Sequence, residues 1–438
     1  MGRNCLADLG IEDLFSDHSG LVTYIAETER HLSDPDIFVL ASEMCDTNYF
    51  NYKNSIGSNG SGAGLTYKNA YYSTLGECAE RYSLSVICPE KLLFGNYYSI
   101  KAQHKISNPA LWKMFHESQL NKIPFDEFTD KSNIAWVYAS DLLQNEEVLI
   151  PACAVYLPYF PHFSKENEKI VFPAVSTGAA CSVSFTDAIL KGIYELIERD
   201  AFIICWRNQL NMPEIIIDEN STIYSTYLKK FKRDHLEFKL YYTKLDMKVH
   251  SVFGLLYADD NQTNRKLVYC GGACHHSPEV AVIKTLLELV QGLKWGEYCK
   301  SEKFTPNPDF SNVTSFKDRM LLYITGNYNE AFSFLKGDRK IELSKIKRYE
   351  FTSDKEYLID ILSFLKENNF EVYAIDVAPV DIEQCNLKVV KVLIPNFETM
   401  EGNYNWQFLG KTRYLEIPKK LGFTGTNLGQ NTYPHPYP

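Results

Sequence analysis

Hydrophobic and polar positions repeat with a helical period in three long segments, residues 67–83, 186–206 and 278–298. At 3.6 residues per turn, the first segment has one apolar face, which carries Leu75, Cys78, Ala79 and Tyr82. The second and third segments are apolar over most of their circumference, which is typical of buried helices. The pattern therefore predicts three long helices, and it predicts that two of them are largely buried.

Shorter apolar runs between these segments have the composition of β-strands. They read VLIPACAVYL, SVFGLLYAD, RKLVYCGG and LKVVKVLIPNF. The Gly/Ser-rich stretch SNGSGAG at 58–64 predicts a loop, and the charged stretches near 115–135 and 301–355 predict irregular connections. Strands that alternate with helices predict an α/β (α+β) fold.

The three helical segments share the pattern [S/T]-x3-A-x6-E-x2-[E/Q], and each follows a run of small residues (SGAG, STGAA or GGA). The hydroxyl residue stands where a helix N-cap is expected, and the alanine allows close packing. The matched residues are Thr66, Ala70, Glu77 and Glu80, then Ser184, Ala188, Glu195 and Glu198, then Ser277, Ala281, Glu288 and Gln291. Glu77 and Glu195 are 118 residues apart, and Glu195 and Glu288 are 93 apart. Such uneven spacing predicts repeated strand–helix units inside one domain rather than a solenoid.

The polar face of the first segment carries Ser73, Glu77, Glu80 and Arg81. For any one helix, the simplest interpretation is a solvated face with local ion pairs. Burial of the helices argues against this interpretation, because several buried carboxylates need compensating cations. The two arginines of the pattern do not balance its five glutamates. Mg²⁺ binds carboxylate and phosphate oxygens, arginine binds phosphate, and helix N-termini offer N–H groups to phosphate. The residues therefore predict a site for Mg²⁺ and a phosphorylated ligand.

Composition limits the other functions. The 45 basic and 55 acidic side chains give a net charge of -10, which argues against nonspecific nucleic-acid binding. No apolar run approaches 18 residues, and the N-terminus lacks the apolar region of a signal peptide, so we expect no membrane span and a cytoplasmic location. The 11 cysteines show no disulfide framework.

Two further features have simple explanations. CGGACHH contains Cys270, Cys274, His275 and His276, but no second cluster follows, so strand-end or loop positions are favoured over a zinc site. The terminal PHPYP, taken alone, is typical of a disordered polyproline II stub.

STLGECAER, YELIERDA and LLELVQ together resemble the ATP-binding signature of the YcaO family. The ending PHPYP resembles the PxPxP tail of its azoline-forming branch, and the chain is most similar to the D component of thiazole/oxazole-modified microcin synthetases of the streptolysin S type. The likeness runs from about residue 60 to 438, so we expect a YcaO-like catalytic domain there with a central ATP/Mg²⁺ cleft. Residues 1–59 are expected to form an N-terminal segment that is structural or contacts a partner.

This resemblance implies an ATP-dependent peptide cyclodehydratase that converts Cys, Ser or Thr of a ribosomal precursor peptide to thiazoline or oxazoline. It implies ATP and Mg²⁺ as cofactors, with Mg²⁺ on Glu80, Glu195, Glu198 and Glu288. The nucleotide would be held by Ser73, Glu77, Arg81, Arg199 and Gln291. Arg199 and the C-terminal carboxylate of Pro438 would take part in catalysis. Some family members have a lysine in the first glycine loop, but here it reads Gly62-Ala63-Gly64.

The resemblance also implies partners. These are the precursor peptide, a separate leader-binding protein similar to E1 enzymes, and in some systems a flavin-dependent azoline dehydrogenase; a homodimer is compatible with it. Two alternatives stay open: a YcaO enzyme that forms thioamides with external sulfide, and a non-catalytic scaffold that binds ATP or peptide. The PHPYP tail argues against the first, and the intact carboxylates argue against the second.

Overall fold

The computed structural model describes residues 10–47, 59–163, 167–260, 265–299, 301–423, 429 and 431–437. The helices are α1 (Tyr67–Ser85), α2 (Tyr97–Lys101), α3 (Phe185–Arg207), α4 (Thr222–Thr226), α5 (Pro278–Cys299), α6 (Phe316–Ile324), α7 (Asp354–Glu367), α8 (Val380–Gln384) and α9 (Arg413–Lys420). The strands are β1 (Val22–Glu27), β2 (Phe38–Met44), β3 (Asn59–Gly64), β4 (Leu93–Gly95), β5 (Ile134–Asp141), β6 (Glu146–Pro151), β7 (Ala179–Ser182), β8 (Glu214–Ile216), β9 (Leu236–Tyr242), β10 (His250–Asp260), β11 (Arg265–His275), β12 (Lys340–Glu342), β13 (Tyr373–Asp376) and β14 (Lys388–Leu393).

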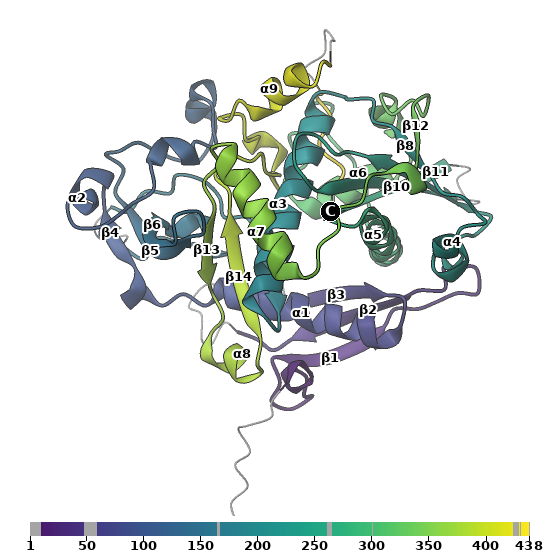
Figure 1. Ribbon diagram of the computed structural model, residues 1–438, viewed down its shortest axis with the longest axis horizontal. Coiled ribbons are helices and arrows are strands. Elements are labelled where there is room, and N and C mark those ends of the chain that lie inside the picture. The colour runs from purple at the N-terminus through teal and green to yellow at the C-terminus, as the bar shows by residue number, and fades with distance from the viewer. Residues whose placement is uncertain are drawn as a thin grey trace, which may run out of the picture.

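The strands form three sheets, which lie around α3 (Figure 1). One sheet has the order β1-β2-β3, and a second has the order β11-β10-β9-β8-β12. The third has the order β4-β5-β13-β14-β7, with β6 paired to β5. The helix α3 is the most deeply buried of the three long helices, because Ala201–Arg207 is buried at every position.

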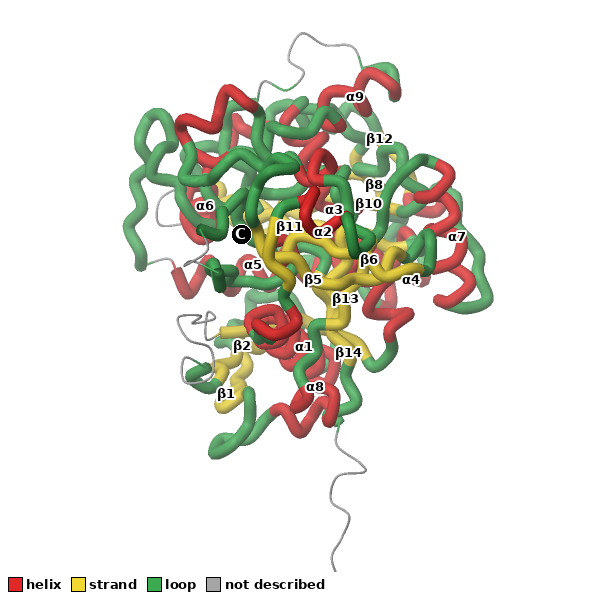
Figure 2. The backbone as a smooth tube through the Cα atoms, turned by 90° about the vertical axis from the view of Figure 1, so that its left-hand side faces the viewer, coloured by secondary structure: helices red, strands yellow, loops and turns green. Residues whose placement is uncertain are grey.

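The three long helices and their preceding strands form a closed ring of contacts. Each helix packs against the strand just before it and against the strand of the next unit: α1 contacts β3 and β7, α3 contacts β7 and β11, and α5 contacts β11 and β3. Figures 1 and 2 show α1, α3 and α5 converging near the centre of the molecule. The repeated sequence pattern therefore corresponds to three repeated structural units.

The predicted helices are confirmed to within two residues at each end. The side chains of Thr66 and Ser184 accept hydrogen bonds from the backbone N–H groups of Asn69 and Asp187, as N-caps do. Ser277 Oγ accepts from the backbone N–H of Val280. The shared alanines, Ala70, Ala188 and Ala281, are each 0% exposed, which fits their predicted role in close packing.

The prediction of a loop at 58–64 is wrong for the part that the structure describes, because Asn59–Gly64 is β3. Its glycines are explained by packing. A Cβ at Gly62 would lie 2.5 Å from the backbone N of Thr74, and one at Gly64 would lie 2.5 Å from the backbone N of Ala70. Both distances are too short, so β3 can approach α1 this closely only with glycine at these positions. The run GGA before α5 likewise lies in β11, whereas only Ala179 and Ala180 of STGAA lie in β7.

The remaining predictions of strands and loops are partly confirmed. β10, β11 and β14 lie where apolar runs predicted them, but VLIPACAVYL is strand only to Pro151 and continues as the 3₁₀ helix Ala152–Ala154. The stretch 301–355 was expected to be irregular, and it contains α6 and β12. Short elements of this kind bury too few residues to give a clear periodic signal.

Strands from both sides of residue 59 share the β1-β2-β3 sheet. The boundary at 59/60 therefore stays a prediction of where the family likeness begins. In the described part of the chain, no helix is long and apolar enough to cross a membrane.

Candidate functional site

The first shared glutamate of each long helix binds the backbone of its own unit's strand segment. The donor is in every case the N–H of a small residue 16 or 17 positions earlier: Ser61 to Glu77 (2.7 Å), Gly178 to Glu195 (3.0 Å) and Gly272 to Glu288 (3.0 Å). Since these N–H groups bind carboxylates, the expectation that they face phosphate is wrong at these three positions. They fix the orientation of the glutamates instead.

The second shared position reaches across to the next unit. Glu80 Oε1 accepts a hydrogen bond from the backbone N–H of Cys181 (2.7 Å), and Gln291 Nε2 donates to Ser61 Oγ (2.6 Å). Glu198 differs, because its only hydrogen bond within the described chain comes from the hydroxyl of Tyr437, at 3.4 Å. These cross-unit contacts bring side chains from sites far apart in the sequence into one cluster.

The two arginines of the pattern have different environments. Arg81 is exposed, and it donates to Glu77 Oε1 (2.6 Å) and to the backbone oxygen of Asn59 (2.8 Å). Arg199 lies inside, where its Nε is 3.5 Å from Glu198 Oε1 and 3.7 Å from Glu195 Oε1. That buried Nε has no hydrogen-bond partner in the described part of the chain, so it is available to a ligand.

Most of the predicted nucleotide-binding residues line one cleft of about 1330 Å³. We call it the helix cleft, because α1, α3 and α5 supply much of its wall. The predicted residues on this wall are Ser73, Glu77, Glu80, Arg81, Glu288 and Gln291. Glu195, Glu198 and Arg199 do not line it, but they interact electrostatically with Glu80 or Glu288 on its wall.

The carboxylates of the cluster lack sufficient cations. The pKa of Glu80 is raised to about 8, chiefly by burial; the Cys181 N–H opposes this rise and the charge of Glu195 contributes to it. Burial also raises the pKa of Glu198 to about 8 and the pKa of Glu288, although Arg199 opposes both shifts. The four predicted Mg²⁺ ligands, Glu80, Glu195, Glu198 and Glu288, accept no hydrogen bond from a cationic side chain within the described ranges.

Hard oxygen donors with excess negative charge fit Mg²⁺. No three His, Cys, Asp or Glu side chains in the described parts of the chain lie close enough together to hold a metal unaided. This agrees with the usual behaviour of Mg²⁺, which binds one or two carboxylates together with substrate phosphates. Coordination by all four glutamates stays a prediction. In CGGACHH, Cys270 and Cys274 are buried on β11, which fits the predicted strand position.

The tail is not a frayed stub over residues 433–437. Its backbone oxygens accept hydrogen bonds from Trp206 Nε1 (at Tyr433, 3.1 Å), Tyr323 (at Pro434, 2.6 Å) and Arg319 (at His435, 3.3 Å). The ring of Tyr437, which is 1% exposed, lies 4.5 Å from the guanidinium of Arg199. A Cβ at Gly272 would lie 2.0 Å from the Tyr437 hydroxyl, so glycine is required there. Pro438 lies outside the described residues.

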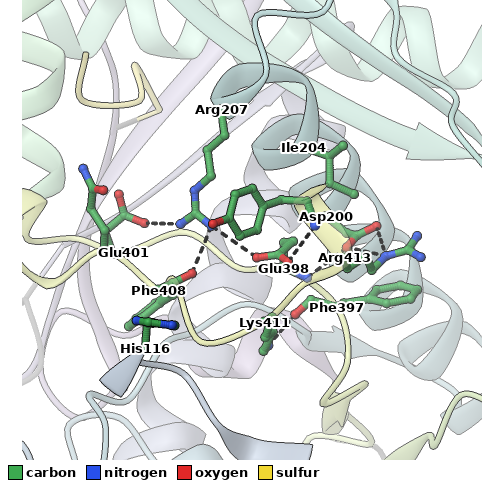
Figure 3. A network of polar contacts seen from close by, with 12 residues as sticks. His116, Asp200, Ile204, Arg207, Phe397, Glu398, Glu401, Phe408, Lys411 and Arg413 are labelled. Atoms are coloured by element: carbon green, nitrogen blue, oxygen red, sulfur yellow. Dashed lines mark hydrogen bonds and ion pairs between the residues drawn. The ribbon is translucent and has the colours of Figure 1, made fainter. Parts of the chain in front are cut away.

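A second charged cluster supports the tail and the C-terminal half of α3 (Figure 3). Arg413 donates to Asp200 at 2.9 Å and to Asp246 at 2.7 Å, and Arg207 Nη1 lies 3.3 Å from Glu398 Oε2. We call this the clamp network, and its members are Asp200, Arg207, Asp246, Arg319, Glu398, Glu401, Lys411 and Arg413. Arg319 joins it to the tail, since it binds both Glu401 (3.2 Å) and His435.

Sequence reasoning missed two lysines on the cleft wall, Lys191 and Lys284. A signal was present, because each stands one helical turn before a shared glutamate, as Ser73 does in the first unit. It also missed Tyr437, because nothing in PHPYP shows what the tail packs against.

Comparisons with known proteins agree with this geometry. A family model described as a YcaO cyclodehydratase that binds ATP and Mg²⁺ matches residues 61–398. An uncharacterized protein of Methanothermobacter thermautotrophicus is 29% identical over 273 residues, which are 61% of this chain and 66% of that protein. The chain thus spans slightly less than two thirds of this relative.

Solved structures share the fold. A heterocyclase in complex with substrate and cofactor has a TM-score of 0.77 at 20% identity, over 97% of this chain and 56% of its own. YcaO from Methanopyrus kandleri bound with AMPPCP and Mg²⁺ has a TM-score of 0.61 at 18% identity, over 86% of both chains. The E. coli microcin synthetase McbBCD complex with pro-MccB17 bound gives 0.56 at 15% identity, over 87% of this chain and 90% of that one. The chain belongs to the YcaO family of cyclodehydratases, which bind ATP and Mg²⁺.

Proposed function

We propose that this protein is an ATP-dependent peptide cyclodehydratase that makes thiazolines or oxazolines in a ribosomal precursor peptide. A Cys, Ser or Thr side chain attacks the carbonyl carbon of the preceding amide, and ATP phosphorylates the amide oxygen. Loss of phosphate then leaves the azoline ring. The observation that carries the proposal is the cluster of undercompensated carboxylates beside the helix cleft, next to the buried tail.

The residues have distinct tasks in this proposal. Glu80, Glu195, Glu198 and Glu288 hold Mg²⁺, which neutralises phosphate charge when it is bound. Ser73, Glu77, Arg81, Arg199 and Gln291 hold the nucleotide. Among the described residues, Nε of Arg199 has ion pairs with Glu195 and Glu198 but no hydrogen-bond partner, which supports its assignment to a phosphate oxygen, because a buried N–H without a hydrogen bond is costly.

The tail supplies the proposed base. Tyr437 stands between Gly272 and Arg199, and its hydroxyl lies 3.4 Å from Glu198 Oε1, so the described end of the tail lies beside the carboxylate cluster. We assign the carboxylate of Pro438 to accept the proton of the attacking Cys, Ser or Thr. The hydrogen bonds at Tyr433, Pro434 and His435 support this role, since they fix the tail before the substrate arrives.

Adding two glycines after Pro438 tests this assignment without removing any buried residue. We expect cyclisation to fall at least about a hundred-fold, while the melting temperature and the Mg·ATP affinity stay near those of the unmodified protein. Cyclisation at the normal rate would remove the carboxylate from the mechanism.

Partners belong to the same proposal. The microcin synthetase structure holds its precursor in a multicomponent complex, and we expect a separate E1-like protein to deliver the leader peptide here. A flavin-dependent dehydrogenase would oxidise azolines in a later step. Equal leader-dependent rates with and without the E1-like protein would contradict the dependence on it.

Mass spectrometry of the precursor after incubation with enzyme, partner, ATP and Mg²⁺ tests the reaction class. Azoline formation removes one water for each ring. A thioamide-forming enzyme would instead exchange oxygen for sulfur when sulfide is supplied, and a scaffold would leave the mass unchanged. Omission of ATP is the control, since it should prevent the loss of water.

A further inference from the structure

A fully buried lysine lies in the strand β14. Side chains alternate along a strand, so Lys391 shares a face with the buried residues Val389 and Leu393, and it is itself 0% exposed. In the described part of the chain, its ammonium group makes hydrogen bonds but no ion pair. A buried ammonium group without a counterion costs free energy, so an apolar residue would serve better here unless the charge has a task.

The hydrogen bonds of Lys391 go to the backbone of the segment that precedes β7. Its Nζ donates to the oxygen of Val175 at 2.6 Å and to the oxygen of Thr177 at 2.7 Å. The peptide unit that joins Thr177 to Gly178 also carries the Gly178 N–H, which donates to Glu195. This unit is trans, so it is planar and its C=O and N–H point in opposite directions. Lys391 and Glu195 therefore bind opposite ends of one rigid group.

The other two repeat units hold the equivalent peptide inside a strand. Ser61, which binds the glutamate of the first unit, is paired with β2, and Gly272 in the third unit is paired with β10. Thr177 and Gly178 instead precede β7, and Thr177 lies outside every strand of the described chain. Lys391 thus supplies at the Thr177 oxygen the restraint that strand pairing supplies in the other units.

The charge of Lys391 acts along the same line. Burial lowers the pKa of Lys391 to about 7, and the charge of Glu195 opposes this shift. An ammonium group polarises the peptide unit whose oxygen it binds, and this strengthens the N–H at the other end as a donor. A neutral side chain would provide neither this polarisation nor an attraction for Glu195.

We propose that Lys391 is a positioning residue, which fixes the peptide unit between Thr177 and Gly178 and thereby holds the carboxylate of Glu195 in the orientation for Mg²⁺. Lys391 does not line the helix cleft, so it acts through Glu195 and not on the nucleotide. The inference rests on the Mg²⁺ site of the proposed function, but not on cyclisation.

Calorimetric binding of ATP to the full chain, at a series of Mg²⁺ concentrations, tests the proposal. Lys391→Met keeps the length of the side chain and removes its ammonium group. We expect the Mg²⁺ concentration for half-maximal binding to rise about ten- to a hundred-fold, as for other residues that orient a metal ligand. Mg·ATP forms in solution equally for every variant, so the shift reports on the protein.

A double-mutant cycle with Glu195→Gln distinguishes positioning from a general loss of structure. In the Glu195→Gln background, Lys391→Met should change the Mg²⁺ requirement less than about two-fold, because the group it positions is already altered. Equal shifts in both backgrounds would overturn the proposal. Lys391→Gln is the second variant, since its amide can still donate to one oxygen, and its shift should be smaller. Failure of both Lys391 variants to fold would assign the residue to structure alone and overturn the proposal too.

Lys294→Met is the matched control, because Lys294 is a buried lysine that pairs with Asp34 and does not line the cleft. It should lower the melting temperature, since Asp34 is left buried without its partner, and it should leave the Mg²⁺ requirement within about two-fold. Lys355→Met is the second control, because it removes an equal charge from an exposed position on α7 that does not line the cleft. It should change neither quantity.

An unchanged Mg²⁺ requirement in Lys391→Met overturns the proposal, and so does an equal rise in either control. Because ring formation is not measured, a protein that binds Mg·ATP with the help of Lys391 but forms no ring would contradict the proposed function alone.

Discussion

The helix α3 contributes to two clusters of charged side chains that are built differently. Its cleft-facing side contributes to a cluster of six carboxylates and four cations, namely Glu77, Glu80, Asp187, Glu195, Glu198 and Glu288 with Arg81, Lys191, Arg199 and Lys284. Its C-terminal half contributes to the clamp network, which has four carboxylates and four cations; Figure 3 shows part of this network, around Arg207, Glu398 and Arg413. The first has excess negative charge and the second is balanced.

Hydrogen bonding separates the clusters further. Every carboxylate of the clamp network accepts a hydrogen bond from an arginine. In the cleft cluster, Glu80, Glu195 and Glu288 accept hydrogen bonds from backbone N–H groups instead. A buried charge that the protein itself satisfies stabilises a structure, whereas one left undercompensated keeps its capacity for a ligand. This is the difference that we expect between a structural cluster and the proposed binding cluster on one helix.

The largest effect is expected from breaking the balanced cluster. Arg413→Met leaves Asp200 and Asp246 buried without their guanidinium, so it should lower the free energy of unfolding by about 3–5 kcal/mol. Chemical denaturation measures this change. The control Lys355→Met should cost less than about 0.5 kcal/mol. If Arg413→Met cost no more than that control, the clamp network would not be structural.

A matched pair of glutamates sharpens the comparison. Glu198→Gln should reduce ATP-dependent product at least about a hundred-fold while its stability stays equal or rises by up to about 1 kcal/mol. Glu398→Gln should instead lose about 1–3 kcal/mol of stability, because Arg207 loses a charged partner.

Thermal shift gives the second readout for this pair. Saturating Mg·ATP should raise the melting temperature of Glu398→Gln as it does for the unmodified protein, and this rise should vanish in Glu198→Gln. Loss of the shift in both variants, or in neither, would contradict the separation of tasks.

The smallest effect comes from a buried group that carries no charge. Burial, and to a lesser extent Lys244, lowers the pKa of His250 to about 4. Because the unfolded chain titrates near about 6.5, it takes up the proton first as the pH falls. Above about pH 6.5, the burial of His250 therefore costs almost no stability. At pH 5 it lowers the free energy of unfolding by about 2 kcal/mol, because the unfolded chain is protonated there and the folded one is not.

Urea unfolding at pH 7 and pH 5 measures this loss, and His250→Gln should reduce it. The glutamine keeps a polar group next to Tyr242, whose hydroxyl lies 2.7 Å from His250 Nδ1. An equal loss in both proteins would assign the pH dependence to other groups.

The sequence predicted the parts of the molecule that repeat. The helix-capping residues, the buried alanines and the carboxylates could be found because three segments carry the same pattern. The strand β3 could not be predicted, because glycine is usually a sign of a turn and here its small size serves packing on α1. The local conformational propensities of residues 59–64 carry no information about α1, whose close packing requires glycine at Gly62 and Gly64.

The contacts of the clamp network and of the tail could not be predicted from the sequence, for a different reason. Asp200 and Arg413 are 213 residues apart, and Arg319 and His435 are 116 apart. Neither pair has a periodic signal, so only the fold shows that they meet. Lys284 could have been identified as a residue of the cleft wall from the repeat alone. It stands four residues before its shared glutamate, as Ser73 and Lys191 do in the other two units.

The contact between Tyr437 and Arg199 joins two residues that are 238 positions apart, so the helix α3 is translated long before its partner in the tail. All three long helices are synthesised before Tyr437, whose aromatic ring covers Arg199. Chains that stop before Tyr437 would therefore contain the three long helices but lack the ring that covers Arg199. Quality control that only senses unfolded chains would not remove them, and in the function proposed here they would compete with the longer chain for nucleotide.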